Sequence, residues 1–131
     1  MRVYISGKMT GCPDLNRPAF DAAEKRLTAQ GHFVINPAEL SAQFGTPDEI
    51  AESFSWAYGT HEGKPIVDFH VGDIVRGGRL ACAVMDADLA AVRSCDAIYL
   101  LKGWEKSRGA KKELAEAIKC GLEVMLAGGE E

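Results

Sequence analysis

The segment 95–117 constrains this chain most, because it has the pattern of a buried strand, a turn and a helix in direct succession. Residues 97–101 are mostly apolar, residues 103–109 include two glycines, a serine and an arginine, and residues 110–120 carry apolar side chains at helical spacing. In open α/β proteins, ligands bind at the edge where strands end and helices begin. This segment therefore predicts both a fold class and the place of a binding site.

The rest of the chain continues the alternation of strands and helices. Strands are predicted at 3–6, 33–36, 97–101 and 122–126, and helices at 18–30, 47–58, 80–94 and 110–120. The run Thr46-Pro47-Asp48-Glu49 is a capping box that starts the second helix. The alternation predicts a three-layer α/β domain with a doubly wound, parallel sheet of four or five strands, as in flavodoxin-like and Rossmann-like folds.

Composition favours one domain over residues 1–131. The chain has 131 residues, is 47% hydrophobic and has a formal net charge of −4. An acidic chain does not suit broad electrostatic attraction to a nucleic-acid polymer or an anionic membrane, and no run approaches the length of a membrane span. Four cysteines without paired spacing, and three histidines without metal-ligand spacing, lead us to expect a cytoplasmic protein with reduced thiols and no metal or cofactor.

Two stretches give no clear pattern. Residues 59–79 hold five glycines and cannot be assigned to an element, so we interpret them as a possible lid or insertion. Residues 128–131 have the composition of a frayed tail.

Glu113 is the first candidate for chemistry. It lies near the start of the last predicted helix, on the flank of a stripe predicted to be buried and formed by Ala110, Leu114, Ala117 and Ile118. The positive end of the helix dipole would hold its carboxylate ionised, ready to act as a nucleophile or to stabilise positive charge. The same spacing also fits an early-helix acid with no catalytic role.

Asp88 is the second candidate. It belongs to an acidic group with Asp86 and Asp96, which precedes the strand at 97–101. Two carboxyl groups near one glycosidic carbon can divide the work of nucleophile and proton donor. We expect Asp88 to approach the carboxyl edge of the sheet, and the other two to be surface acids.

The turn after the first strand is a candidate for anion or sugar binding. Small residues let backbone N–H groups approach a phosphate, and hydroxyl and ammonium groups add donors. Arg17 and Arg108 could add charge, although lone arginines are usually solvated surface residues. Tyr4, Met9 and Trp104 could stack on a base, although aromatic residues beside strand ends more often belong to the core. The turn matches neither dinucleotide nor nucleoside-triphosphate loop patterns. Its residues are Ser6, Gly7, Lys8, Met9, Thr10 and Gly11.

Four segments, 2–11, 16–20, 36–38 and 95–110, together resemble DUF4406, a phage and bacterial family of unknown function. That family looks like a branch of the nucleoside 2-deoxyribosyltransferase superfamily. The resemblance covers both ends of the chain and leaves the middle unmatched.

The resemblance implies roles for several residues. In the characterised transferases and the related deoxynucleotide N-hydrolases, a glutamate in a Gly-x-x-x-Glu-Leu-Gly-x-Ala pattern attacks the anomeric carbon. Residues 109–117 match this pattern around Glu113, with Ala115 in place of the second glycine, and 88–96 resemble the segment that carries a further aspartate, here Asp88. An aspartate expected six residues before the glutamate is replaced by Ser107. The substrate-binding residues implied at this edge are Trp104, Ser107, Arg108 and Gly109.

These observations predict cleavage or exchange of the N-glycosidic bond of a nucleoside or nucleotide, with a 5′-monophosphate favoured by the basic residues. Ser107 favours the alternative of a nucleotide-binding module without catalysis. A purely structural or partner-binding domain would place Glu113 and Asp88 apart. We also expect a homo-oligomer, because apolar residues near the middle of the chain need cover: Phe54, Trp56, Tyr58 and Phe69.

Overall fold

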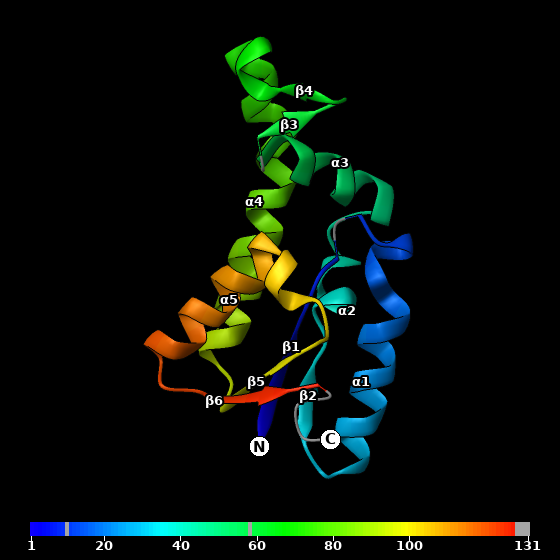
Figure 1. The fold of residues 1–131 in the computed structure, drawn as a ribbon, viewed down its shortest axis with the longest axis vertical. Coiled ribbons are helices and arrows are strands. Elements are labelled where there is room, and N and C mark those ends of the chain that lie inside the picture. Colours follow the sequence, from blue (N-terminus) through cyan, green and yellow to red (C-terminus); the bar gives the residue numbers. More distant parts are fainter. Residues whose placement is uncertain (10, 58, 128–131) are drawn as a thin grey trace.

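A parallel sheet forms the centre of the molecule. The computed structural model describes residues 1–9, 11–57 and 59–127. The strand order is β2-β1-β5-β6 and all three pairings are parallel (Figure 1). The central strands β1 and β5 are almost wholly buried, as the inner strands of a covered parallel sheet should be. The bounds are β1 (Arg2–Ser6), β2 (Phe33–Ile35), β5 (Ala97–Leu100) and β6 (Glu123–Leu126).

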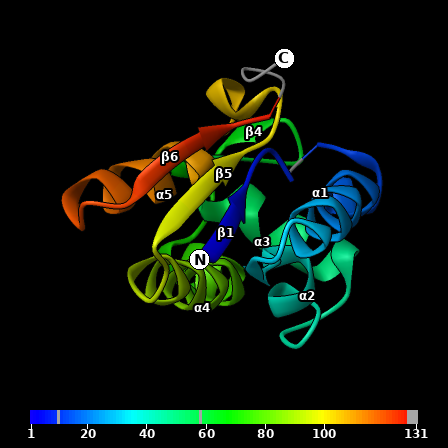
Figure 2. The ribbon, with the colours of Figure 1, turned by 90° about the horizontal axis from the view of Figure 1, so that it is seen from below.

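Helices cover both faces of this sheet. On one face, α1 (Arg17–Ala29) buries Phe20, Ala23 and Leu27 against the strands. On the other face, α4 (Val71–Arg93) and α5 (Arg108–Lys119) contribute Val92 and Ala117 to a second cluster with β1 and β5. Figure 2 shows β1, β5 and β6 side by side from the end of the molecule. The predicted three-layer α/β architecture is confirmed.

The sheet topology reverses beside β1. The chain runs from β1 to β2 on one side, then crosses to β5 on the other side of β1. Ser6 and Leu100 are register partners, so the carboxyl ends of β1 and β5 lie together. Crevices beyond the carboxyl ends at such a reversal are the usual ligand sites of open α/β sheets.

Two further helices follow β2. Helix α2 (Pro37–Ser41) was not expected from the sequence, and the Asn36 side chain caps it by accepting from the backbone N–H of Ala38 at 2.9 Å. Helix α3 (Pro47–Ala57) starts with the predicted capping box. The Thr46 N–H donates to Glu49 Oε1 at 2.8 Å, and the Glu49 N–H donates to Thr46 Oγ1 at 3.2 Å.

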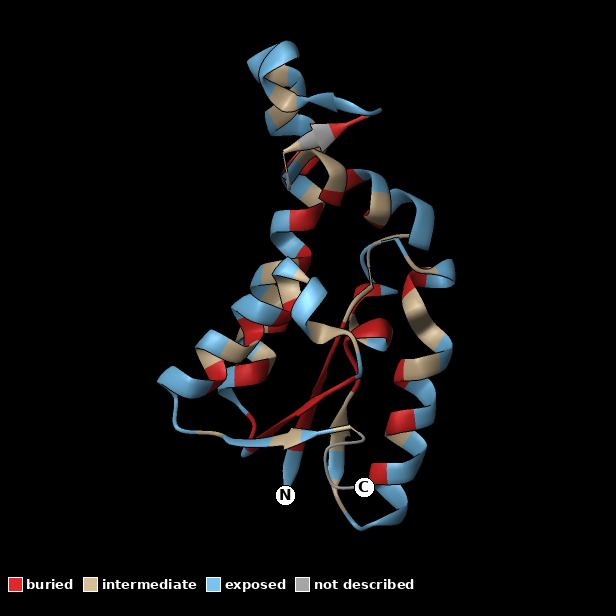
Figure 3. Cartoon of the chain, viewed as in Figure 1, coloured by how far each residue is buried: buried red, intermediate tan, exposed pale blue. Residues whose placement is uncertain are grey.

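The segment 59–79 forms a projection with the end of α3 (Figure 1). It contains the hairpin β3 (Thr60–His61) and β4 (Lys64–Pro65), and then the first turns of α4, which begins at Val71 and not at residue 80 as predicted. Figure 3 shows that exposed residues predominate there. At Gly77 a Cβ would lie 2.2 Å from the Trp56 ring, so this glycine in mid-helix serves packing and does not break the helix.

The structure corrects the prediction that Phe54, Trp56 and Phe69 leave uncovered apolar surface. Phe54 is buried, and Trp56 stacks on His61 with ring centroids 3.8 Å apart while Phe69 packs edge-on against both rings. These side chains therefore cover one another, and Tyr58 lies outside the described residues, as does the tail 128–131. Within the described part of the chain, no helix combines the length and apolarity that a membrane span needs.

The predicted stripe of α5 was also partly wrong. Ala110 and Ala117 are buried and Leu114 is half-buried, but Ile118 is 64% exposed and Glu113 only 5% exposed. The buried face of this helix thus carries a carboxyl group at its centre. Burying a carboxyl group costs free energy unless its oxygens find partners, so the surroundings of Glu113 decide what it can do.

Candidate functional site

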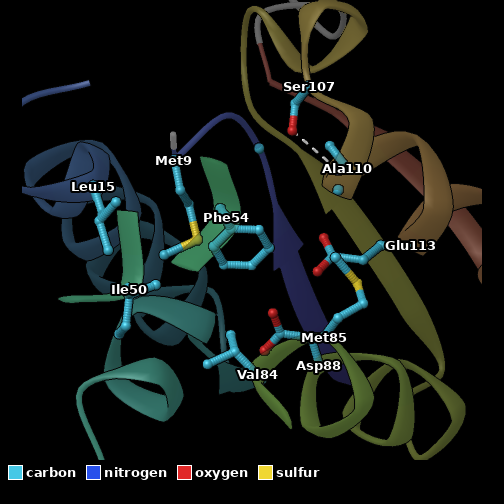
Figure 4. Close-up of a pocket in the computed structure, with 12 residues that line it drawn as sticks. Met9, Leu15, Ile50, Phe54, Val84, Met85, Asp88, Ser107, Ala110 and Glu113 are labelled. Atoms are coloured by element: carbon cyan, nitrogen blue, oxygen red, sulfur yellow. Dashed lines mark hydrogen bonds between the residues drawn. The ribbon is translucent and has the colours of Figure 1, made fainter. Parts of the chain in front are cut away.

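A small cavity lies beyond the carboxyl ends of β1 and β5, between α3, α4 and α5. Its volume is about 30 Å³. The carboxyl groups of Asp88, from α4, and Glu113, from α5, both face it, and Figure 4 shows them with the apolar side chains opposite. The lining residues are Gly7, Met9, Leu15, Ile50, Phe54, Val84, Met85, Asp88, Ser107, Gly109, Ala110 and Glu113.

Two hydroxyl groups from β1 hold the Glu113 carboxyl. The Tyr4 hydroxyl donates to Oε2 at 2.8 Å, and the Ser6 hydroxyl donates to Oε1 at 2.6 Å. Tyr4 and Ser6 are two residues apart, so both point to the same face of the strand, and both are completely buried. Each carboxyl oxygen thus has a donor, which fixes the orientation of Glu113 at the cavity.

Asp88 is less well satisfied. Its side chain is 3% exposed, and Oδ1 is a buried oxygen without a hydrogen-bond partner in the described part of the protein. An unpaired buried oxygen is costly and is therefore rare unless it has a role. Because Asp88 lines the cavity, a ligand there could supply the missing partner.

Burial raises the pKa of each of the three titratable side chains at the site, those of Glu113, Asp88 and Tyr4. It raises the pKa of Glu113 from its ordinary 4.5 to about 7, against the hydrogen bonds from Ser6 and Tyr4, which lower it. Burial, followed by the charge of Glu113, raises the pKa of Asp88 from 3.8 to about 9. Burial and the two carboxylates raise the pKa of Tyr4 well above 10.

This result corrects the expectation that the helix dipole keeps Glu113 ionised. Desolvation raises the pKa of both carboxyl groups, so the pair keeps at least one proton near neutral pH. Two neighbouring carboxyl groups whose pKa values are pushed apart can serve as an ionised nucleophile and a proton donor. The pair therefore has the electrostatic arrangement that acid-assisted substitution at one carbon requires.

The structure gathers some of the predicted site residues and not others. Glu113, Asp88, Gly7, Met9, Ser107 and Gly109 line the cavity, and Ser6 supports it through Glu113. Gly7 is required by close approach, because a Cβ there would lie 2.9 Å from Leu101. Ser107 also caps α5, accepting from the Ala110 N–H at 3.1 Å.

Other predicted residues lie outside the lining. Lys8 is half-exposed, Gly11 and Arg108 are exposed, and Thr10 is outside the described residues. Trp104 packs against the cluster under α5, away from the cavity. Of the two possibilities for Tyr4, base stacking or a place in the core, the structure shows the core, since its ring is buried and its hydroxyl donates to Glu113.

The other acidic and basic residues considered from the sequence, Asp86, Asp96 and Arg17, lie away from the two carboxyl groups of the cavity. Asp86 and Asp96 are exposed, as expected, and Asp96 accepts from the Arg2 N–H at 2.9 Å. Arg17 pairs with Asp21 and Glu39. Across the described ranges, no group of three or more His, Cys, Asp or Glu side chains is placed to hold a metal ion.

Sequence reasoning missed the apolar half of the cavity. Its wall is built by Leu15 and by side chains from α3 and α4, in a third buried cluster that contains Leu15, Ile50, Phe54, Ala81 and Val84. Helical spacing in 47–57 could have signalled Ile50 and Phe54 as inward-facing. No local signal marks Leu15, which follows Pro13 in an irregular turn.

Comparison with known protein families gives a match. The family model described as "Domain of unknown function (DUF4406)" matches residues 1–58 and 45–126. The chain belongs to the DUF4406 family. The two matched ranges include every cavity residue of this DUF4406 protein. No curated protein and no solved structure matches the chain.

Proposed function

We propose that this DUF4406 protein cleaves or exchanges the N-glycosidic bond of a nucleoside or nucleotide. The observation that carries the proposal is the pair of buried carboxyl groups, Glu113 and Asp88, which open onto one cavity with pKa values of about 7 and about 9. The resemblance of 88–96 and 109–117 to the deoxyribosyltransferase patterns supports the same assignment. No metal or cofactor is needed for this chemistry.

In the first step, the ionised Glu113 attacks C1′ of the sugar. The bond from C1′ to the base nitrogen breaks, and the protonated Asp88 gives its proton to the departing base. Tyr4 and Ser6 hold the attacking carboxylate in place by their hydrogen bonds. In the second step, water or another base attacks C1′ from the vacated side, Glu113 is released, and the attacking group returns a proton to Asp88.

The substrate class that we propose is a 5′-monophosphate. Ser107 and Gly109 at the start of α5 face the cavity, and backbone N–H groups at a helix N-terminus favour an anion. Lys8 follows Gly7 directly and would approach the same phosphate from the loop. This arrangement differs from the prediction in one respect, because Ser6 is occupied by Glu113 and is not a free donor.

The experiment that tests the proposal is incubation with a panel of nucleosides and 5′-monophosphates, with free base measured by chromatography. Glu113→Gln removes the charge and keeps the shape, so we expect turnover to fall by about 10³-fold or more. Glu105→Gln, an exposed acid in the 3₁₀ turn Trp104–Lys106, is the matched control and should leave turnover unchanged. Equal rates for Glu113→Gln and wild type would assign Glu113 to structure.

A nucleotide-binding module without catalysis is the second candidate, favoured by Ser107 at the place of an expected aspartate. The two candidates differ in one measurement on the wild-type protein. Calorimetric binding of a nucleotide without any release of free base would support the module, whereas release of base would support the enzyme.

We also propose a homo-oligomer, but the exposed apolar residues that support it differ from those considered in the sequence analysis. Val67, Val71 and Val75 on the projection are 83%, 71% and 56% exposed, and the last two are one helical turn apart. Light scattering should give a mass above that of one chain, and Val71→Asp should reduce it. A single-chain mass for wild type at micromolar concentration would contradict this proposal.

A further inference from the structure

A second cavity shares a wall with the candidate catalytic cavity. It has a volume of about 410 Å³ and lies between the turn before α1 and the helices α2 and α3. Three side chains, those of Met9, Leu15 and Ile50, line both cavities. They therefore form the partition between the two spaces.

The volumes show that the first cavity must enlarge for a ligand to reach both carboxyl groups, and the partition is the wall that it shares with a larger space. A cavity of about 30 Å³ has room for roughly two water molecules, whereas ligand pockets span roughly 300–1,000 Å³. The volume of the second cavity, about 410 Å³, falls within that range without any contribution from the first. Joining the two spaces would connect Glu113 and Asp88 to a chamber large enough for a small ligand.

Within the partition, Leu15 is held inward by the packing of its side chain, and its backbone conformation opposes that position. Its side chain is 6% exposed and packs in the cluster with Ile50, Phe54 and Val84, which holds it inward. Its backbone is left-handed, with φ 52°, and its neighbours Asp14 and Asn16 are left-handed too, with φ 52° and 63°. Asp and Asn adopt this region more readily than other L residues, so the strain falls mainly on Leu15, and it persists only where the surrounding structure enforces it.

The chemistry of the second cavity limits what it can hold. Its lining is largely apolar, and Arg17, the cationic side chain among the described lining residues, is already paired with Asp21 and Glu39. Asp14 adds a further carboxylate at the rim. These surroundings disfavour phosphate and suit an uncharged group.

We propose that Leu15 is a gate between the two cavities, and that the second cavity admits the uncharged ring of the ligand when Leu15 swings out. Relief of the left-handed strain favours the open position, and burial of the Leu15 side chain favours the closed one. The Asn16 side chain donates to the Lys8 carbonyl at 2.9 Å, so opening also moves the loop after β1. The identity of the ring rests on the proposed function, but the gate does not.

The test uses thiol labelling, which requires no turnover. Val84, 1% exposed in the catalytic cavity, is replaced by cysteine in the full chain. The chain supplies two internal references, Cys82, exposed on the same helix, and Cys95, buried elsewhere. Methyl methanethiosulfonate is added, and modification of each cysteine is followed by peptide mass spectrometry.

We expect the thiol introduced by Val84→Cys to react at least tenfold more slowly than Cys82. Adding Leu15→Ala should speed labelling of the introduced thiol at least tenfold and leave Cys82 and Cys95 unchanged, while the volume-conserving Leu15→Met should change it less than twofold. Equal rates with and without Leu15→Ala would overturn the gate. Faster labelling of Cys95 as well would also overturn it, because the effect would then be a general loosening of the fold.

A separate experiment tests whether the second cavity admits an uncharged ring. In the protein that carries both Val84→Cys and Leu15→Ala, adenine at millimolar concentration should slow labelling, and inorganic phosphate should not. Protection by phosphate, or by neither probe, would overturn the assignment of the second cavity. The gate is judged by the labelling rates alone, so its failure is distinguishable from failure of the proposed catalysis, which is judged by release of free base.

Discussion

The buried carboxyl pair predicts an unusual dependence of stability on pH. In the folded protein Asp88 holds its proton up to a pKa of about 9 and Glu113 up to about 7, whereas the unfolded chain loses them near 3.8 and 4.5. The folded state therefore binds more protons than the unfolded state between these limits. The free energy of unfolding must fall as pH rises through this window.

The magnitude follows from the number of protons held. Each one contributes a slope of about 1.4 kcal/mol per pH unit. From about pH 5.5 to 6.5 both groups contribute, so the free energy of unfolding falls with up to twice the slope of a single proton, and above about pH 7.5 only Asp88 contributes. Against a typical domain stability of about 5–15 kcal/mol, this change is easily measured.

The assay is urea unfolding followed by circular dichroism at half-unit steps of pH. Asp88→Asn keeps the shape of the side chain and cannot ionise, so its stability should stop falling above about pH 7.5 and should exceed that of wild type at pH 8.5. Asp86→Asn, on the exposed side of the same helix, is the control and should follow wild type. A wild-type stability that is flat or rises between pH 5.5 and 8.5 would refute the reasoning, as would equal slopes in Asp88→Asn and wild type.

Three further predictions concern single residues. Tyr4→Phe removes a hydrogen bond that lowers the pKa of Glu113, so the acid limb of a pH–rate profile should move to higher pH; an unmoved limb would separate Tyr4 from Glu113. Gly77→Ala would force a Cβ against Trp56 and should cost about 1–3 kcal/mol in urea unfolding, whereas Gly78→Ala, whose Cβ has its nearest contact at 3.8 Å, should be neutral or stabilising; equal effects would contradict the packing argument. Lys8→Met should weaken calorimetric binding of a 5′-monophosphate by about threefold to tenfold and leave the nucleoside unchanged, and equal weakening of both would remove Lys8 from phosphate binding.

The sequence by itself determined the layers of the fold. Apolar runs at β1 and β5, helical spacing at Phe20, Ala23 and Leu27, and the capping box at Thr46 are local patterns, and local patterns set secondary structure. Alternating strands and helices then leave a parallel sheet covered on both faces as the consistent arrangement. The same reasoning placed Glu113 and Asp88 near the sheet edge, because the helices that carry them come directly before and after β5 along the chain.

Only the tertiary structure decided the length of α4. Gly72, Gly77 and Gly78 lower helix propensity and made its first turns resemble a loop, yet the helix starts at Val71, where His70 caps it by accepting from the Gly72 N–H at 3.0 Å. Gly77 is explained by the Trp56 ring that packs on it, a contact between residues on different helices. Propensity was overridden because packing stabilises a helix more than local preference does.

The character of the site was likewise a tertiary outcome. Glu113 looked like a flank residue held ionised by its helix, but burial against β1 raises its pKa and pairs it with Tyr4, 109 residues away in the chain. The cavity wall at Leu15 depends on a left-handed turn that its packing and the hydrogen bond from Asn16 to the Lys8 carbonyl enforce. Desolvation, long-range hydrogen bonds and enforced strain depend on the environment that the whole fold creates, so a reading of neighbouring residues along the chain could not supply them.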